Sequence, residues 1–211
     1  MLTRLQRGCD ALGLALESGQ AEQLIAYLEL LLKWNSAYNL TAVRDPAQMV
    51  TRHLLDSLAV APYLRGQNPI DVGTGAGLPG IPLAILYPER RISLLDSNGK
   101  KTRFLFQVKT ALRLDNMQVH HARVESFRPP APYDAVLSRA FASLADMVAA
   151  CRHLLAPQGC FLAMKGAYPA QEIAELAPVY AVTALHELSI PGLDEQRHLV
   201  ELAIRNSGEA P

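Results

Sequence analysis

Short apolar runs alternate with longer amphipathic segments from Pro69 to the end of the chain. Runs of this length between turn residues predict strands, and the amphipathic segments between them predict helices. We expect strands within residues 69–73, 91–97, 116–122, 133–140, 159–166, 180–188 and 197–205. We expect helices within residues 80–88, 98–115, 143–155 and 170–177. This alternation predicts an α/β fold, with a mostly parallel seven-stranded sheet covered on both faces and an antiparallel final strand.

The first 66 residues have the periodicity of helices. Over residues 21–40, apolar side chains recur at spacings of three and four, at Leu24, Ile25, Leu28, Leu31, Leu32 and Trp34. A second helix is predicted within residues 45–64, with Asp45 as its N-cap, Pro46 at its first position and apolar residues at helical spacing until Pro62. We therefore expect an N-terminal helical extension over 1–66, packed on an α/β domain over 67–207 as a single structural unit.

The composition is that of a globular domain, with 50% hydrophobic and 19% charged residues among 211. Lys and Arg number 20, as do Asp and Glu, so the net charge indicates no polyanionic partner, although a balanced total can hide a basic face. Cys9, Cys151 and Cys160 lack the spacing of a metal site and predict free thiols in a reducing compartment. Without a signal peptide or an apolar run of about 18 residues, we expect a cytoplasmic protein with no membrane segment and no metal.

The stretch IDVGTGAGLPGIP, residues 70–82, follows the first predicted strand and admits two classes of ligand. Its GAGLPG segment matches the G-x-G-x-x-G pattern of dinucleotide-binding loops, which alone is a weak indication. Asp71 would face the pyrophosphate of a dinucleotide, at a cost of roughly 3 kcal/mol for a ~5 Å pair at an effective dielectric of ~20. Pro79 and Pro82 also remove two of the N–H groups with which a helix N-terminus binds phosphate. Both features disfavour a dinucleotide.

The same stretch reads Asp71-x-Gly73-x-Gly75-x-Gly77 and resembles the loop of S-adenosylmethionine-dependent methyltransferases. Glycines in that loop let the backbone approach the methionine part of the cofactor, which a Cβ would obstruct. The carboxylate at the strand end favours a cationic sulfonium or ammonium group. The pattern therefore favours a methyltransferase over a nicotinamide-dependent oxidoreductase, and a glycine turn without a ligand is the third possibility.

Later strand ends supply further cofactor-binding candidates. Asp96 ends the second strand, where it would hold the ribose hydroxyls or, alternatively, cap the next helix, a role for which Ser97 and Asn98 compete. Val124 and Glu125 follow the third strand, where methyltransferases contact adenine, although Glu125 could equally be a surface residue. Arg139 follows the fourth strand and needs an anionic partner, such as the cofactor carboxylate or an RNA phosphate. The N/D-P-P-Y/F motif of enzymes that methylate exocyclic amines is absent there, which argues against an adenine-N6-type acceptor.

Seven segments extend the resemblance over nearly the whole chain, in the order KWNSAYNLTAVRDP, RHLLDS, DVGTGAGLPGIPLAI, LLDSNGKKTRFL, SRAFASL, MKG and RHLV. Together they resemble the glucose-inhibited division protein B family of bacterial small-subunit (16S) ribosomal RNA guanine-N7 methyltransferases. Ala76 stands where the loop of this family often has proline.

The resemblance implies a class I, Rossmann-like S-adenosylmethionine-dependent methyltransferase fold. It also implies that the acceptor is a guanine in the decoding-region loop of 16S rRNA. In this family, loss of the enzyme is linked to low-level streptomycin resistance. The cofactor contacts that it implies are Gly73, Leu78, Val124, Glu125 and Arg139.

Guanine N7 carries a lone pair and no proton, so its methylation needs alignment with the methyl group rather than a general base. We accordingly assign no certain catalytic residue and give Arg139 a positioning role. His53 and Asp56 lie one helical turn apart, and we expect them to form a structural pair that docks the N-terminal helices on the glycine loop.

RNA binding requires basic groups that neutralise phosphates. The candidates near strand ends, each of which alone would be a solvated surface charge, are Lys100, Lys101, Arg103, Arg123, Arg139, Lys165 and Arg197. Phe141 could stack on a flipped base, although core packing is the simpler role. We expect the partner to be small-subunit rRNA or the small ribosomal subunit, not DNA or a membrane, and the protein to be a monomer. A non-catalytic RNA-binding protein with the same fold remains an alternative.

Overall fold

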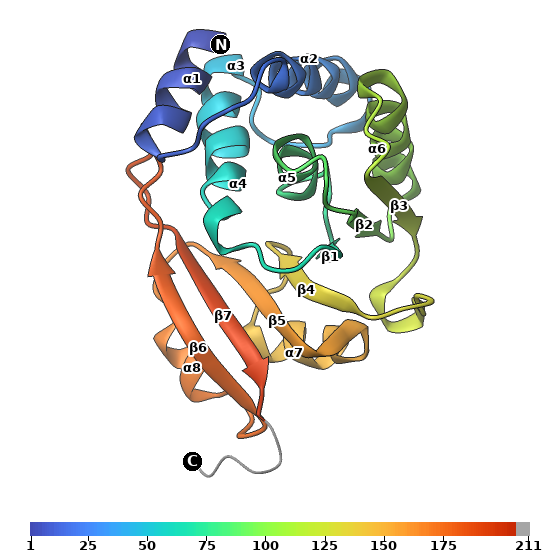
Figure 1. Ribbon diagram of the computed structural model, residues 1–211, viewed down its shortest axis with the longest axis vertical. Coiled ribbons are helices and arrows are strands. Elements are labelled where there is room, and N and C mark those ends of the chain that lie inside the picture. The colour runs from blue at the N-terminus through green and yellow to red at the C-terminus, as the bar shows by residue number, and fades with distance from the viewer. Residues whose placement is uncertain (206–211) are drawn as a thin grey trace.

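The computed structural model describes residues 1–205, which contain one seven-stranded sheet (Figure 1). Its strands are β1 (Pro69–Val72), β2 (Ile92–Asp96), β3 (Met117–His121), β4 (Tyr133–Ser138), β5 (Leu155–Lys165), β6 (Tyr180–Glu187) and β7 (His198–Ile204). They lie in the order β3-β2-β1-β4-β5-β7-β6. Neighbours from β3 to β5 are parallel, whereas β7 is antiparallel to both β5 and β6. The predicted sheet, with its antiparallel final strand, is confirmed.

The sheet grows in opposite directions from β1, which pairs with β2 on one side and with β4 on the other. The place where the strand order reverses is called a topological switch point. In an open parallel sheet, the loops on its two sides run apart and leave a crevice at the carboxyl ends of the strands. The loops after β1, β2 and β4 therefore meet at this edge.

Helices cover both faces of the sheet (Figure 1). One face carries α5 (Gly80–Leu86) and α6 (Gly99–Leu112), and the other carries α7 (Leu144–Cys151) and α8 (Ala170–Ala174). The core is divided accordingly, because successive side chains of a strand point to opposite faces. On β4, Leu137 packs into the apolar cluster that includes α5 and α6, while Val136 packs into the cluster that includes α7.

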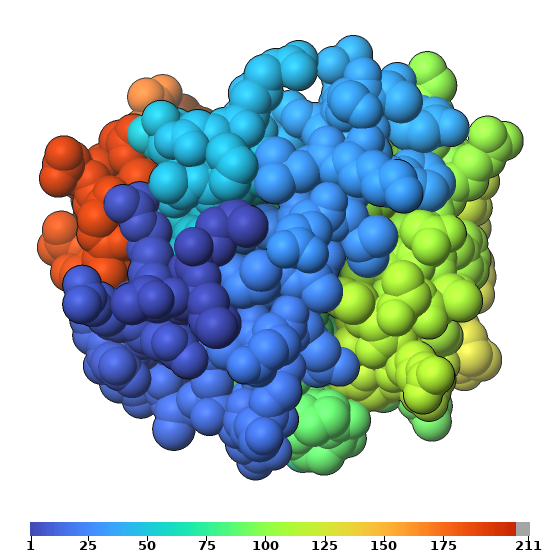
Figure 2. Space-filling model, turned by 90° about the horizontal axis from the view of Figure 1, so that it is seen from above, coloured from blue at the N-terminus to red at the C-terminus, as the bar shows by residue number. Residues whose placement is uncertain are grey.

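The N-terminal segment covers the same face as α5 and α6 and contributes to the same apolar cluster. Figure 2 shows it in blue and cyan between α6, in green, and the β6–β7 region, in red. Its elements are α1 (Leu2–Ala11), α2 (Gln20–Tyr38), α3 (Pro46–Met49), a π-helical turn (Val50–Leu55), α4 (Asp56–Leu58) and a 3-10 turn (Ala61–Tyr63). The predicted cap at Asp45 is confirmed, since its Oδ1 accepts a hydrogen bond from the amide of Ala47 at 3.0 Å.

Two elements differ from the predictions. The helix expected over 45–64 contains the π-helical turn, which a pattern of apolar spacing does not distinguish from an α-helix over so few residues. Strand β5 begins at Leu155, earlier than expected, because a register shift opposite Tyr133 and Ala135 keeps Pro157 and Gly159 within the strand.

Among the helices of residues 1–205, none combines the length and the apolar character needed to cross a bilayer. The last two residues of the predicted 67–207 domain lie outside the described part of the chain.

Candidate active site

The loop between β1 and α5 depends on glycine at defined points. Gly73 and Gly77 have φ values of +68° and +93°, in the region that favours glycine. A Cβ on Gly73 would lie 2.6 Å from the Cβ of Ala140, and a Cβ on Gly77 would overlap Ile81. The requirement at Gly77 therefore comes from packing within the protein. Gly73 is exposed, so its bare backbone is open to a ligand.

Asp71, near the end of β1, holds this loop through hydrogen bonds of its side chain. Its carboxylate is buried, and Oδ2 accepts hydrogen bonds from the Thr74 hydroxyl at 2.6 Å and the Gly80 amide at 2.9 Å. Burial raises the pKa of Asp71 to about 6, although both hydrogen bonds act in the opposite direction. The expectation that Asp71 faces the charge of the cofactor needs correction, because Asp71 lines neither cavity described below. It still disfavours a phosphate ligand, since it occupies the amide at the start of α5.

Asp96 reaches the same loop from the end of β2. Its Oδ2 accepts a hydrogen bond from the Gly75 amide at 2.9 Å, and its Oδ1 accepts one from the Asn98 amide at 2.8 Å. The cap of α6 is Asn98, whose side chain accepts from the amides of Lys100 and Lys101, so the capping alternative for Asp96 was wrong. Each carboxylate oxygen keeps a lone pair with which it could accept a ribose hydroxyl.

Two adjoining cavities open at the carboxyl ends of the strands. The first, which we call the strand-end cavity, has a volume of about 260 Å³. The residues that line it are Val72, Gly73, Leu95, Asp96, Ser97, Lys101, Ala122, Arg123, Val124, Glu125, Ala140 and Phe141. It thus brings together four residues predicted to bind the cofactor, namely Gly73, Asp96, Val124 and Glu125. Phe141 forms part of its wall and packs against the α7 core, which favours the core role over stacking on a flipped base.

The second cavity, the loop cavity, has a volume of about 210 Å³ and shares Gly73 and Ala140 with the first. Its other lining residues are Leu40, Thr41, His53, Thr74, Gly75, Ala76, Leu78 and Arg139. The predicted residues Gly75, Leu78 and Arg139 therefore lie here, whereas Gly77 lines neither cavity.

Three lining residues of the loop cavity come from the N-terminal segment, namely Leu40, Thr41 and His53, and of these the sequence predicted only His53 to lie near the glycine loop. For Leu40 and Thr41, the indication in the sequence was their place in the segment KWNSAYNLTAVRDP, and His53 belongs to the segment RHLLDS.

The expected pairing of Asp56 with His53 is wrong. Instead, Oδ2 of Asp56 accepts a hydrogen bond from Nη1 of Arg139, and its Oδ1 accepts one from Nε of Arg197, both at 2.9 Å. His53 Nε2 lies 2.9 Å from the Thr41 hydroxyl oxygen, and burial lowers the pKa of His53. The N-terminal helices are thus connected to the site through Asp56 with Arg139 and Arg197 rather than through a pair of Asp56 with His53. The sequence could not reveal the partner of Arg139, because Asp56 lies 83 residues away in the chain.

The basic residues predicted to bind RNA differ in how far they are already paired. Lys165 Nζ lies 2.8 Å from a Glu172 carboxylate oxygen and also donates to the carbonyls of Phe141 and Ala142. Arg197 is bound to Asp56, and Lys101 Nζ lies 3.8 Å from Asp96. The charges of these three residues are therefore compensated within the protein.

Lys100, Arg103 and Arg123 are exposed. Within residues 1–205, their side chains form no ion pair. They remain the better candidates for phosphate contacts.

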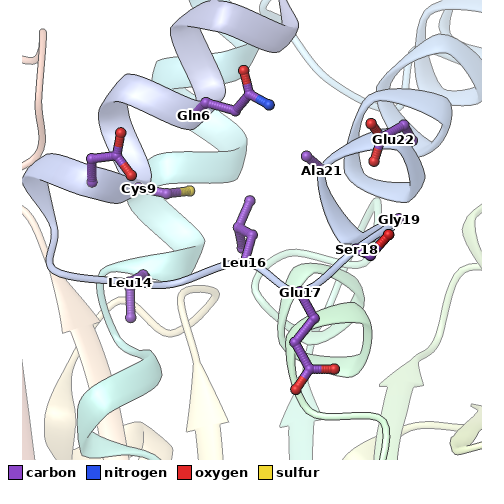
Figure 3. Close-up of a pocket in the computed structure, with 10 residues that line it drawn as sticks. Gln6, Cys9, Leu14, Leu16, Glu17, Ser18, Gly19, Ala21 and Glu22 are labelled. Carbon is purple, nitrogen blue, oxygen red and sulfur yellow. The ribbon is translucent and has the colours of Figure 1, made fainter.

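A larger hollow, of about 500 Å³, lies between α1 and the beginning of α2 (Figure 3). Cys9 and Leu16 line it, as do the acidic residues Asp10, Glu17 and Glu22. It contains none of the predicted site residues, and its acidic side chains would repel RNA phosphates. The size of this hollow therefore does not make it the active site.

Comparison with solved structures agrees with the fold. The glycopeptide N-methyltransferase MtfA, in complex with S-adenosyl-L-homocysteine, has a TM-score of 0.59 at 13% identity, covering 72% of this chain and 87% of that chain. The mitomycin 7-O-methyltransferase MmcR has a TM-score of 0.60 at 15% identity, covering 75% of this chain and 56% of that chain. At these identities the likeness concerns the fold alone, which is the predicted class I methyltransferase fold.

Comparison with sequences is more specific. The proteins named Ribosomal RNA small subunit methyltransferase G from Pseudomonas aeruginosa and Ectopseudomonas mendocina are 57% and 56% identical to this chain over 199 and 200 residues. Both alignments cover 94% of this chain, and they cover 93% and 94% of the respective relatives. Residues 20–200 match the family described as GidB, rRNA small subunit methyltransferase G. The chain therefore belongs to the GidB family, as the resemblance of its motifs predicted.

Proposed function

We propose that this protein transfers a methyl group from S-adenosylmethionine to N7 of a guanine in the decoding-region loop of 16S rRNA. The observation that carries the proposal is the pair of adjoining cavities, which meet at Gly73 and Ala140. Their residues fit the two ends of this cofactor. Val124, Glu125 and Asp96 would hold the adenosine in the strand-end cavity, and the glycine loop and Arg139 would hold the methionine part in the loop cavity.

The cofactor supplies an electrophilic methyl group, and guanine N7 supplies a lone pair without a proton. The residues of the chain therefore have to orient the reactants and exclude water, and no general base is needed. The imidazole of His53 agrees with this scheme. It is held by Thr41, and its lowered pKa keeps it neutral beside a cationic cofactor.

Small-subunit rRNA as the substrate is supported by the names of the family and of the relatives. The exposed cations Lys100 and Arg103, on the first turns of α6, would contact its phosphates beside the strand-end cavity. We further propose that the protein acts as a monomer in the cytoplasm, on free 16S rRNA or on the assembled small subunit.

The test is transfer of label from methyl-labelled S-adenosylmethionine to small subunits and to free 16S rRNA, both lacking the modification. We expect one labelled guanine, at which borohydride and aniline cleave the RNA chain. Label found only in protein, DNA or a small molecule would contradict the proposal. Stabilisation of the fold by a nicotinamide dinucleotide but not by S-adenosylhomocysteine would favour an oxidoreductase instead. Binding of subunit RNA without methyl transfer would favour the non-catalytic alternative.

A further inference from the structure

Asp56 connects three segments that are far apart in the sequence. It is the first residue of α4, and its carboxylate is buried between Arg139, which follows β4, and Arg197, which precedes β7. Each carboxylate oxygen accepts one guanidinium hydrogen bond at 2.9 Å. Charge-assisted hydrogen bonds of this length are among the stronger polar contacts in proteins.

Arg139 uses only part of its hydrogen-bonding capacity in this contact. A guanidinium carries five N–H groups, and within the described residues the Arg139 side chain makes one hydrogen bond, to Asp56. Its side chain is 31% exposed and lines the loop cavity together with Gly73 and Gly75. The remaining donors are thus available to an anionic group bound in that cavity.

The arginine side chain is long and has many rotamers, so fixing it in one of them on ligand binding costs conformational entropy. A contact that already holds Arg139 in place reduces this cost. Asp56 fixes one edge of the guanidinium before any ligand arrives. It also balances one of the two arginine charges, so the cluster of Arg139, Asp56 and Arg197 carries a net charge of about +1 beside a cationic sulfonium. A single carboxylate on the ligand matches this charge.

We propose that Asp56 is a positioning residue that acts through Arg139, holding its guanidinium so that the free N–H groups meet the carboxylate of S-adenosylmethionine. The inference rests on the proposed function for the identity of the cofactor. Arg197 lies outside the lining of both cavities and binds the other carboxylate oxygen of Asp56.

The test is a double-mutant cycle on the full chain, with S-adenosylhomocysteine affinity measured by titration calorimetry. Asp56→Ala and Arg139→Ala are each expected to weaken binding about tenfold. The double variant is expected to bind no more weakly than Arg139→Ala alone, because Asp56 acts only through that side chain. A purely structural role predicts that Asp56→Ala weakens binding by the same factor in both backgrounds, and that result would overturn the proposal. So would unchanged affinity in Asp56→Ala.

A matched control uses another contact between the same two parts of the chain. Arg52, in the π-helical turn, pairs with Glu195 of the β6–β7 connection, and neither residue lines the two cavities. Glu195→Ala should leave the affinity within about twofold. If Asp56→Ala does not fold by circular dichroism, the same cycle is run with Asp56→Asn, in which one of the two arginines loses its acceptor. Because the measurement contains no RNA, a failure of rRNA methylation would leave its outcome unaffected. A wild-type protein that does not bind S-adenosylhomocysteine would contradict the proposed function itself.

Discussion

The hydroxyl of Tyr27 donates a hydrogen bond to the backbone carbonyl of Ala76 at 2.8 Å, and this joins helix α2 directly to the glycine loop. Tyr27 is fully buried, and its ring packs near Phe104 of α6. The N-terminal segment therefore supports the backbone that lines the loop cavity, besides contributing Leu40, Thr41 and His53 to its wall.

Tyr27→Phe should weaken both the fold and cofactor binding. The ring stays packed, but the Ala76 carbonyl loses its buried donor, at a cost of about 1–2 kcal/mol of unfolding free energy. Because that carbonyl belongs to the loop, we expect S-adenosylhomocysteine affinity to fall about threefold or more. Urea unfolding and titration calorimetry measure the two effects.

Tyr87→Phe is the control for this prediction. The Tyr87 hydroxyl donates to the carbonyl of Ala61 at 3.0 Å, in a region that lines neither cavity. Tyr87→Phe should lower the free energy of unfolding by an amount similar to or smaller than that for Tyr27→Phe, and it should leave S-adenosylhomocysteine affinity unchanged. Equal losses of affinity in both variants would show that the Tyr27 contact has no specific connection with the loop.

Asp71→Asn should change the pH dependence of stability. The folded protein holds the pKa of Asp71 near 6, above the ordinary value of about 3.9 in the unfolded chain. The folded state therefore binds the proton more tightly, and stability falls as the pH rises from about 4 through 6. The wild type should lose about 1 kcal/mol relative to Asp71→Asn between pH 5 and pH 7.5, measured by urea unfolding. A difference that stays constant over this range would contradict the raised pKa.

Much of the fold follows from local pattern. The strands and the cap at Asp45 depend on residues close together in sequence, so the sequence predicts them well. The contacts of Asp56 and Tyr27 join segments that only the tertiary structure brings together. The role of Asp71 was misjudged for a related reason. Its position at a strand end indicates the carboxyl edge of the sheet. Whether its carboxylate faces a cavity or binds the loop depends on contacts with Thr74 and Gly80, and these form only in the folded loop.

Gly73→Ala and Gly13→Ala form a matched pair of substitutions. Both glycines have nearly the same φ, +68° and +69°, so the backbone conformation alone should cost each variant about 1–2 kcal/mol of stability. Gly73→Ala should lose more than Gly13→Ala, because its new Cβ would lie 2.6 Å from the Cβ of Ala140. A Cβ at Gly13 has nothing within 4 Å, whereas one at Gly73 meets Ala140 between the two cavities. Calorimetry should therefore find S-adenosylhomocysteine affinity at least about tenfold weaker in Gly73→Ala and unchanged in Gly13→Ala. The larger substitution Gly73→Asp should abolish binding, and normal affinity in that variant would exclude the cofactor from this loop.

Reversing charge at Lys100 and Arg103 should weaken the binding of RNA without affecting that of the cofactor. Both side chains are exposed on the first turns of α6, next to the carboxyl end of β2, and phosphate contacts there would release counterions. Lys100→Glu and Arg103→Glu should each raise KM for the small subunit and reduce the slope of log affinity against log salt by about one. Arg152→Glu is the control, because Arg152 precedes β5 at the opposite, amino edge of the sheet. An equal rise in KM for all three variants would indicate a general charge effect, and no rise in the α6 variants would place the RNA elsewhere.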